Sequence, residues 1–423
     1  MALFFRTSAF SRVTALAARR QVHTAFAWLH NNPKVLMDWQ AELVIIPAPP
    51  FGEEARSAWM AESFRKAGLE DIETDELGNV TGLLHATGLP QDSTGPLVVL
   101  SAHLDTVFPA TTEIKPVLTH ADGCYRLEAP SACDNCAGII GMLALAHVLK
   151  SASVELAAPL LFLGNVGEEG EGDLRGVRHF YEQSRYAGRV AAHIVLDGAG
   201  AESAVTQALG SRRFEVTVTG PGGHSFTDAG TPNPIMALAG ALSTLAETPL
   251  AHEARTTLNV GTIRGGTSVN SIPESATVSV DFRSTNTAEL TRLEVVLHRA
   301  VEDAVGDCNM RAKEKLPRLR GRLNYSIRKI GDRPAAVLAE DSPILEALRA
   351  VDRHLGIATE LRLGSTDANI PIAHGLPALS LGAGGEGGGA HTVAEWYTDR
   401  NRDLGLRRVM LLALTLADWA AEL

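Results

Sequence analysis

Residues 96–106 read PLVVLSAHLDT, and residues 158–169 read APLLFLGNVGEE. In both stretches an unbroken apolar run of strand length ends in side chains that carry an imidazole or a carboxylate. AHIVLD at 192–197 ends in the same way, and ALSLGAG at 378–384 is a fourth apolar run. Continuous apolar runs of this length predict strands that are buried on both faces, as in a parallel sheet.

Helical patterns separate these strands. EEARSAWMAESFRKAG at 53–68 is amphipathic and ends at a glycine, CAGIIGMLALAHVLK at 136–150 is a second helix, and the chain closes on a third. Strands that alternate with helices predict an α/β fold, a mostly parallel sheet flanked by helices. We expect this domain to comprise residues 26–209 and 332–423.

The pattern changes near residue 210. RRFEVTVTG at 212–220 alternates polar and apolar residues, as a half-exposed strand does. Three further strands of this kind and two helices follow before the α/β pattern returns, with the strands at 256–265, 275–283 and 323–331 and the helices at 234–247 and 287–305. We expect a separate α+β domain at 210–331, inserted into the first.

The composition excludes several classes of protein. The chain has 423 residues, of which 45% are hydrophobic and 21% charged, as in a globular protein with a large core. A net charge of −11 argues against a nucleic-acid partner, and no apolar run is long enough to cross a membrane. Four cysteines are too few for a disulfide scaffold and favour a reducing compartment such as the cytoplasm.

Residues 1–25 are expected to form an N-terminal extension. No acidic residue precedes Asp38, whereas Arg6, Arg12, Arg19 and Arg20 do, a composition that resembles an organellar transit peptide. An N-terminal extension or first helix without a targeting role, on a cytoplasmic protein, is the interpretation that we favour, and a transit peptide is the alternative.

Metal-binding side chains gather where the predicted strands end. Ligands of an open α/β sheet bind at the carboxyl ends of its strands. The candidates there, and ahead of the helix at 136–150, are His103, Asp105, Asp134, Glu168, Glu169, Asp197 and His391. Imidazole nitrogens and carboxylate oxygens suit zinc or a similar divalent ion, and a shared carboxylate can bridge two ions. In a tandem glutamate pair, one can bind metal while its neighbour handles a proton.

Six motifs extend this pattern to a known family. HLDT, SACDNCAGIIGML, NVGEEGEGDLRG, LDGAG, GPGGHS and GGGAHT occur in this order. The chain thereby resembles, from about residue 26 onward, the co-catalytic zinc family of peptidase T, aminoacylase, acetylornithine deacetylase and glutamate carboxypeptidase. The stretch at 364–392, GSTDANIPIAHGLPALSLGAGGEGGGAHT, is most similar to the peptidase T-like branch.

The resemblance implies two zinc ions per chain, for which cobalt or manganese could substitute. His103 and Asp197 would bind one ion, Glu169 and His391 would bind the other, and Asp134 would bridge them.

The resemblance also assigns the supporting roles. Asp105 would orient His103, and Glu168 would be the general base that deprotonates a metal-bridged water and then protonates the leaving amine. A cis peptide bond is expected between Asp134 and Asn135, a position where many family members have Asp, Gly or Glu.

For the inserted domain, the resemblance implies a lid that also forms a homodimer. His224 would reach the active site of the neighbouring subunit and stabilise the oxyanion. Asn270 and Arg283 would hold the carboxylate of the substrate, a task that suits the planar fork of arginine.

These features predict a zinc-dependent hydrolase that cleaves the amide bond of short peptides. Hydrolysis of N-acyl amino acids is the alternative within the enzyme class, because the sequence does not show whether the pocket holds a free amine or an acyl chain. A non-catalytic zinc-binding scaffold is the alternative outside it, but we would expect such a protein to have lost Glu168 or a ligand. Cys133 and Cys136 flank Asp134 and are interpreted as buried structural thiols, in preference to a redox pair.

Overall fold

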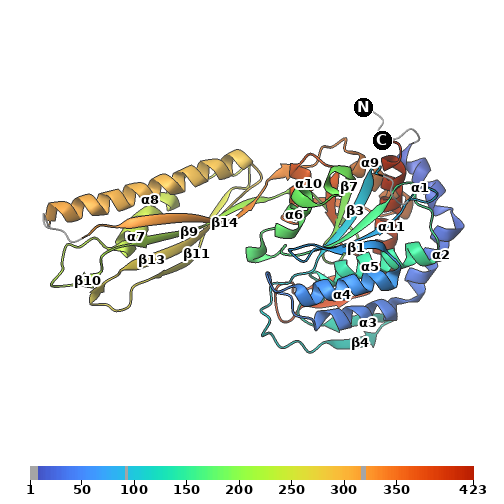
Figure 1. Cartoon of the computed structure of the whole chain (residues 1–423), viewed down its shortest axis with the longest axis horizontal. Coiled ribbons are helices and arrows are strands. Elements are labelled where there is room, and N and C mark those ends of the chain that lie inside the picture. The colour runs from blue at the N-terminus through green and yellow to red at the C-terminus, as the bar shows by residue number, and fades with distance from the viewer. Residues whose placement is uncertain (1–7, 91–93, 316–320) are drawn as a thin grey trace. The chain divides into compact units, whose positions relative to one another are not determined.

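The computed structural model describes residues 8–90, 94–315 and 321–423. The chain divides into two compact units (Figure 1). One comprises the chain up to Ala208 together with Val337–Leu423, and the other is Leu209–Ala336. The first is an α/β unit and the second is an α+β unit inserted into it, which is the fold class that the sequence predicts.

The first unit is built on a sheet of nine strands among the described residues. Its order is β1-β2-β6-β3-β7-β17-β8-β15, with β16 also paired to β8. The central pairs β3–β6, β3–β7 and β7–β17 are parallel, whereas β2 is antiparallel to β6. The strands are β1 (Glu70–Thr74), β2 (Val80–Leu84), β3 (Leu97–His103), β6 (Leu160–Asn165), β7 (Val190–Leu196), β8 (Ser203–Ala208), β15 (Ala336–Val337), β16 (Glu360–Gly364) and β17 (Ala378–Leu381).

Both faces of this sheet are buried, as the continuous apolar runs predict. Alternate residues of β3, such as Val98 and Leu100, belong to the large core, to which α5 (Cys136–Ser151) and α11 (Arg402–Ala420) also contribute. The residues between them, such as Val99, belong to a second cluster that includes Phe180 of α6 (Arg175–Gln183). The other helices of this unit are α1 (Ala9–Ala17), α2 (Arg20–Asn31), α3 (Pro33–Val44), α4 (Glu54–Ala67), α9 (Pro343–Leu355) and α10 (Asn369–Ala373).

A smaller antiparallel sheet, in the order β18-β19-β5-β4, brings two distant loops together. Trp396 of β19 pairs with Glu128 of β5, so the loop that precedes β19 runs beside the loop that follows β5. These loops carry His391 and Asp134. The strands are β4 (Val117–Ala121), β5 (Cys124–Glu128), β18 (Glu386–Gly388) and β19 (Trp396–Thr398).

The inserted unit is a four-stranded antiparallel sheet with helices packed on one face. Its order is β11-β13-β9-β14, and apolar residues on alternate positions of β9 and β13, such as Val216 and Val278, pack against α7 and α8. The elements are β9 (Gly210–Thr219), β10 (Gly223–His224), α7 (Pro234–Ala246), β11 (Thr257–Gly265), β12 (Ser271–Ile272), β13 (Ser275–Ser284), α8 (Thr287–Lys315) and β14 (Asn324–Arg333).

Helix α8 is longer than the predicted helix at 287–305, because it continues through Gly306 to Lys315. A glycine inside a helix costs only about 1 kcal/mol, which tertiary contacts can offset. Ala312 is buried, and the Asn309 side chain both donates to and accepts from the backbone of Leu323.

The N-terminal segment differs from the expected extension. Helix α1 packs on α9 and α11, and Val13 and Leu16 are buried in the large core. The guanidinium nitrogen Nη2 of Arg12 lies 2.6 Å from Oε1 of Glu422, near the other end of the chain. Residues 9–25 are therefore part of the first unit. Within the described residues, no helix combines the length and apolar character that a bilayer span needs.

We expect Leu16→Ala to destabilise the protein by about 2–5 kcal/mol, since it leaves a cavity in the core. Urea unfolding of the metal-free protein measures this change. Thr14→Ala, on the exposed face of the same helix, is the control and should change the free energy of unfolding little. Equal stability of both variants would show that α1 is not docked.

Candidate metal centre

Seven candidate side chains from the sequence lie together at one edge of the large sheet. His103 is the last residue of β3 and pairs in parallel register with Asn165, the last residue of β6. Glu168 and Glu169 follow β6 directly, and Asp197 follows β7. Because the carboxyl ends of parallel strands share one edge, these residues converge. The small sheet and the start of α5 add His391 and Asp134 to the same place.

Asp134 lies at the middle of this cluster. Its Oδ1 lies 3.1 Å from Nε2 of His103, and its Oδ2 lies 3.0 Å from Nε2 of His391. Each carboxylate oxygen therefore faces a different histidine. The peptide bond between Asp134 and Asn135 is cis, as the family resemblance implies.

The surrounding groups form overlapping sets of metal-binding atoms. His103, Asp134 and Asp197 form one set, and Asp134, Glu169 and His391 form another, each with its ligand atoms within 4.8 Å of one another. His103 with Glu168 and Glu169 forms a third. Asp134 belongs to the first two sets, so this donor chemistry fits two divalent cations that share one carboxylate.

Asp105 connects the histidine to the tandem glutamates. It is fully buried, and its Oδ1 lies 3.5 Å from Nδ1 of His103. Its two oxygens accept hydrogen bonds from the backbone N–H groups of Glu168 and Glu169, at 2.9 and 2.8 Å. Burial alone would raise the pKa of Asp105, but the contact with His103 and these donors lower it. The Asp105 carboxylate thus holds the glutamate loop and lies beside Nδ1 of His103, which is also 3.1 Å from the backbone carbonyl of Asp105.

The carboxylates around His103 and His391 favour the protonated imidazoles. Burial opposes the charged form of His103, but Asp105, Asp134 and Asp197 raise its pKa well above the usual value. The hydrogen bond to Asp134 is the main cause that raises the pKa of His391 to about 9. In turn, the two histidines outweigh burial and lower the pKa of Asp134. A cation entering this site therefore displaces protons from the imidazoles.

The loop that carries Glu168 and Glu169 is buried, and an ion pair between Arg175 and Glu53 supports it. Glu168 and Glu169 are 5% and 8% exposed, and burial raises the pKa of Glu169. Arg175 donates from its backbone N–H to the carbonyl of Gly167 and from its guanidinium to both oxygens of Glu53, at 2.6 and 2.7 Å. The two glutamates therefore sit on a supported turn.

Glu395 is a site residue that the sequence reasoning missed. Its carboxylate accepts hydrogen bonds from three backbone N–H groups around the candidate ligand, those of Ser131, Cys133 and Asp134, at 3.1, 2.7 and 2.7 Å. Burial raises its pKa to about 7 although these donors lower it. The sequence feature that could have indicated this role is a glutamate four residues after the predicted ligand His391.

Asp367 and Asn165 form a second polar pair that the sequence reasoning missed. Both are fully buried, and Nδ2 of Asn165 donates to Oδ2 of Asp367 at 2.7 Å. Burial raises the pKa of Asp367 to about 7, while the charge of His103 lowers it. The carboxyl interacts with the charges of His103, Asp105 and Asp197. It belongs to a motif, GSTDAN, that the sequence showed only as part of the family resemblance.

The two cysteines beside Asp134 are buried and do not form a disulfide. Burial is the main cause that raises the pKa of Cys133 to about 12, and burial also raises the pKa of Cys136. Both therefore remain thiols at neutral pH, which agrees with a structural role.

Two of the three candidates in the inserted unit lie together. His224 of β10 pairs with Ser271 of β12, and the carbonyl of Asn270 accepts from the N–H of Ser225 at 3.0 Å. Nδ1 of His224 accepts from the N–H groups of Phe226 and Thr227, at 3.1 and 3.3 Å. A neutral imidazole held in this way carries its proton on Nε2. The exposed ring therefore offers a hydrogen-bond donor.

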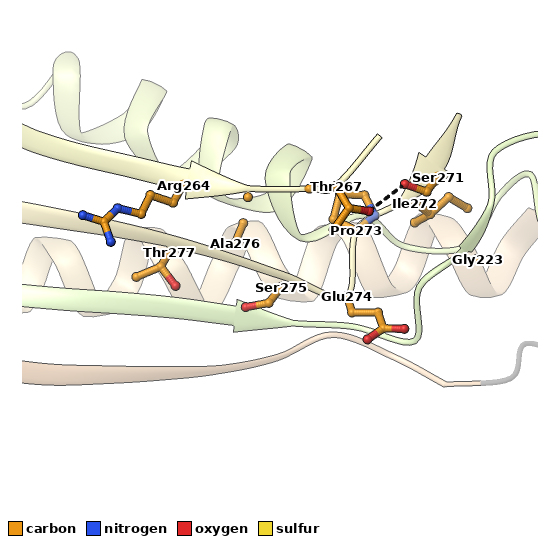
Figure 2. Close-up of a pocket in the computed structure, with 12 residues that line it drawn as sticks. Gly223, Arg264, Thr267, Ser271, Ile272, Pro273, Glu274, Ser275, Ala276 and Thr277 are labelled. Carbon is orange, nitrogen blue, oxygen red and sulfur yellow. Dashed lines mark hydrogen bonds between the residues drawn. The ribbon is translucent and has the colours of Figure 1, made fainter. Parts of the chain in front are cut away.

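An open pocket of about 570 Å³ lies beside this turn (Figure 2). Gly223, Arg264 and Glu274 are among its lining residues, as are Thr267 and Ser271, whose hydroxyls are 3.4 Å apart. Strand β11, which supplies Arg264, is at the edge of its sheet.

Arg283 is far from His224 and Asn270 within the same unit. Arg283 pairs with Ser211 at the start of β9. Ser275, which follows Asn270 and β12 closely in the sequence, pairs with Thr219 at the end of β9. Arg283 is eight positions along β13 from Ser275, which is about 26 Å at the usual rise. Nε of Arg283 lies 2.8 Å from Oδ2 of Asp281, and the side chain is 42% exposed.

A family model for Peptidase family M20/M25/M40 matches residues 99–415. The protein YqjE of Bacillus subtilis is 24% identical to this chain over 367 residues, a match that spans 84% of this chain and 91% of YqjE. A probable carboxypeptidase of Ajellomyces dermatitidis is 28% identical over 256 residues, which is 56% of this chain and 55% of the fungal protein.

The fold also matches a solved structure. A tripeptidase from Staphylococcus aureus superposes with a TM-score of 0.68 at 23% identity, over 93% of this chain and 99% of the tripeptidase. At this identity the likeness establishes the fold. The family model covers most of the chain, includes the candidate metal centre and agrees with the resemblance seen in the motifs. The chain therefore belongs to Peptidase family M20/M25/M40 and is a hydrolytic enzyme of the metallopeptidase and amidohydrolase class.

Proposed function

We propose that this enzyme uses two zinc ions to cleave the amide bond of short peptides. The observation that carries this proposal is the position of Asp134, whose two oxygens face His103 and His391 separately. A carboxylate so placed can bridge two ions. Cobalt or manganese offer similar chemistry and are the alternatives to zinc.

The distances support one division of the ligands. His103 and Asp197 would hold the first ion, since Nε2 of His103 lies 3.8 Å from Oδ1 of Asp197. Glu169 and His391 would hold the second, since Oε1 of Glu169 lies 2.9 Å from Nε2 of His391. Asp105 would orient His103 through its other ring nitrogen, as a carboxylate commonly does for a ligating histidine.

Glu168 is the proposed general base. When bound, the two ions would activate a water molecule and polarise the carbonyl of the scissile bond. Glu168 would take the proton of the water and later pass it to the nitrogen of the leaving amine. Its backbone is fixed by Asp105, and its side chain is almost fully buried, so its position is set before substrate arrives.

Short peptides are the proposed substrates. The tripeptidase and the probable carboxypeptidase among the similar proteins support this class. Arg283 would pair with the C-terminal carboxylate of a peptide, because a guanidinium binds a carboxylate with two parallel hydrogen bonds. N-acyl amino acids carry the same carboxylate and are the alternative substrates. The scaffold alternative predicts metal binding without turnover.

We also propose that the enzyme is a homodimer that shares residues between subunits. One inserted unit holds His224 and Asn270 near one end of its sheet, whereas Arg283 lies about 26 Å along β13 from Ser275, so these three cannot surround one small substrate. In a dimer, the partner could supply His224 and Asn270 to a site that has its own Arg283. The Nε2 proton of His224 would then stabilise the oxyanion.

The exposed edge of the inserted sheet supports the dimer. Strand β11 is unpaired on one side among the described residues, and Val260 and Ile263 on it are 39% and 58% exposed. An open edge of this kind can pair with another chain.

We propose the cytoplasm as the location and neither nucleic acid nor membrane as a partner, since the net charge is −11 and the cysteines do not form disulfides.

The substrate class can be tested with zinc-loaded protein. We expect release of free amino acids from di- and tripeptides and slower hydrolysis of N-acetyl amino acids, measured by chromatography. Peptides with an amidated C-terminus should be poorer substrates, and Arg283→Ala should remove this preference, mainly through KM. Metal-stripped protein is the control and should be inactive. Faster turnover of N-acyl amino acids would instead favour the alternative.

Substitutions of the two adjacent glutamates should have different effects, one on turnover and the other on metal affinity. Glu168→Gln should lower kcat by about 10²–10⁴-fold and keep both ions, because it removes a base and no ligand. Glu169→Gln should lose metal affinity, measured by elemental analysis after dialysis. Loss of metal in Glu168→Gln with retention in Glu169→Gln would reverse the two roles.

Mixed dimers test the sharing of residues between subunits. Co-expression of Glu168→Gln with His224→Ala should restore about a quarter of normal activity, because about half of the dimers are mixed and each has one intact site. Two affinity tags isolate the mixed dimers, which should then have about half of normal activity because one of their two sites is intact. His224→Ala with Asn270→Ala is the matched control and should restore nothing, since every site then carries one lesion. No recovery in the first pair would place His224 in its own subunit's site.

A further inference from the structure

Asn135 is fully buried and lies between two segments that carry predicted ligands. It follows Asp134 directly and precedes helix α5, and its side chain reaches the loop that contains Asp197. The proposed function uses Asp134 and Asp197 but gives Asn135 no role.

The carboxamide of Asn135 contacts the backbone on both sides of Asp197. Its Nδ2 donates to the carbonyl of Leu196 at 2.9 Å, and its Oδ1 accepts from the N–H of Gly198 at 3.0 Å. The same Oδ1 accepts from the N–H of Gly138 at 3.1 Å and so caps α5. One side chain therefore contacts three backbone groups and joins the start of α5 to the Asp197 loop.

A carboxamide makes all these contacts at any pH, whereas a carboxyl group makes them all only when it is protonated. A carboxylate in the same place could accept from Gly138 and Gly198, but it has no proton to donate to Leu196. A serine could cap the helix but is too short to reach the carbonyl of Leu196. The fit is also tight, because a Cβ on Gly138 would collide with Oδ1 of Asn135 and with the carbonyl of Leu196.

The other side of Asp134 is already fixed. Glu395 holds the N–H of Asp134 and joins its loop to the loop of His391. No comparable link to the Asp197 loop comes from Glu395. Asn135 links the segment that carries Asp134 to the backbone on both sides of Asp197, while Leu381 and Ala383 hold the same loop from β17 and the residues after it.

We propose that Asn135 is a positioning residue that sets the distance between Asp134 and Asp197 and so preforms one of the two cation sites. This inference rests on the proposed function, because it takes both aspartates as metal ligands. Asn135 touches neither the ion nor the substrate in this scheme. It acts through the backbone that flanks Asp197.

Metal binding to the stripped protein tests this role without an activity assay. Asn135→Asp and Asn135→Ser both keep a good helix cap, since aspartate and serine cap helices about as well as asparagine. Either variant should lower the affinity for Co²⁺ and Zn²⁺ by about 10–100-fold in competition with a chromophoric chelator, as loss of a group that orients a ligand does. The visible spectrum of bound Co²⁺ should change as well.

Asn309→Asp is the matched control, because Asn309 also bridges a backbone N–H and carbonyl, those of Leu323, but far along the chain from any predicted ligand. It should lower the melting temperature and leave Co²⁺ affinity and spectrum unchanged. Circular dichroism of each stripped variant checks that the fold is retained.

The outcomes separate this inference from the proposed function. Two tightly bound ions in the unmodified protein, together with unchanged affinity and spectrum in both Asn135 variants, would overturn the positioning role and leave the proposed function standing. If the unmodified protein binds neither Co²⁺ nor Zn²⁺, both fall. A loss of affinity in Asn309→Asp as large as in the Asn135 variants would also overturn it, because the effect would then be one of general stability.

Discussion

The carboxylate of Asp134 is the interaction on which the arrangement of the site depends. It lies at 3.1 and 3.0 Å from histidines that come from β3 and from the loop before β19. Those two segments are more than 280 residues apart in the chain and belong to different sheets. This convergence depends on the parallel order of the large sheet, on the pairing of β19 with β5 and on the start of α5.

Gathering so many carboxylates in a buried place is unfavourable unless each is compensated. The compensation here is local and differs from group to group. Asp105 has two backbone donors and an imidazole, Asp134 has two imidazoles, and Glu395 has three backbone donors. In the metal-free protein the remaining negative charge raises the pKa of His103 and of His391. Cation binding and proton release are therefore two sides of one equilibrium, and affinity should weaken as the pH falls.

The sequence predicts the large sheet well because its strands carry the strongest pattern, unbroken apolar runs that end in polar side chains. It also predicts the inserted unit, where alternation marks strands with one exposed face. It misses the length of α8, since Gly306 reads as an end whereas contacts at Ala312 and Asn309 continue the helix. It does not predict that α1 packs on α9 and α11, because these contacts join segments that are far apart in the chain.

Within the site, the sequence identifies the residues that can bind a cation or move a proton, since imidazoles and carboxylates at strand ends are visible locally. The residues that hold them are harder to find. Glu395 and Asn135 act on backbone groups that are distant in sequence, and a single sequence does not show which backbone lies opposite a side chain.

The connection of the inserted unit has a consequence for how such a protein can change. The chain leaves the large sheet after β8 and returns to it at β15, and these strands are neighbours in that sheet. Within the inserted unit, the first and last strands also meet, where Ser211 pairs with Arg333. To the large sheet, the whole insertion is equivalent to the loop between two adjacent strands, and lengthening a loop adds only about 0.6 kcal/mol for each doubling. The inserted unit, which has its own core, is thus free to be exchanged, shortened or rebuilt by recombination while the strands that carry the metal-binding residues stay as they are.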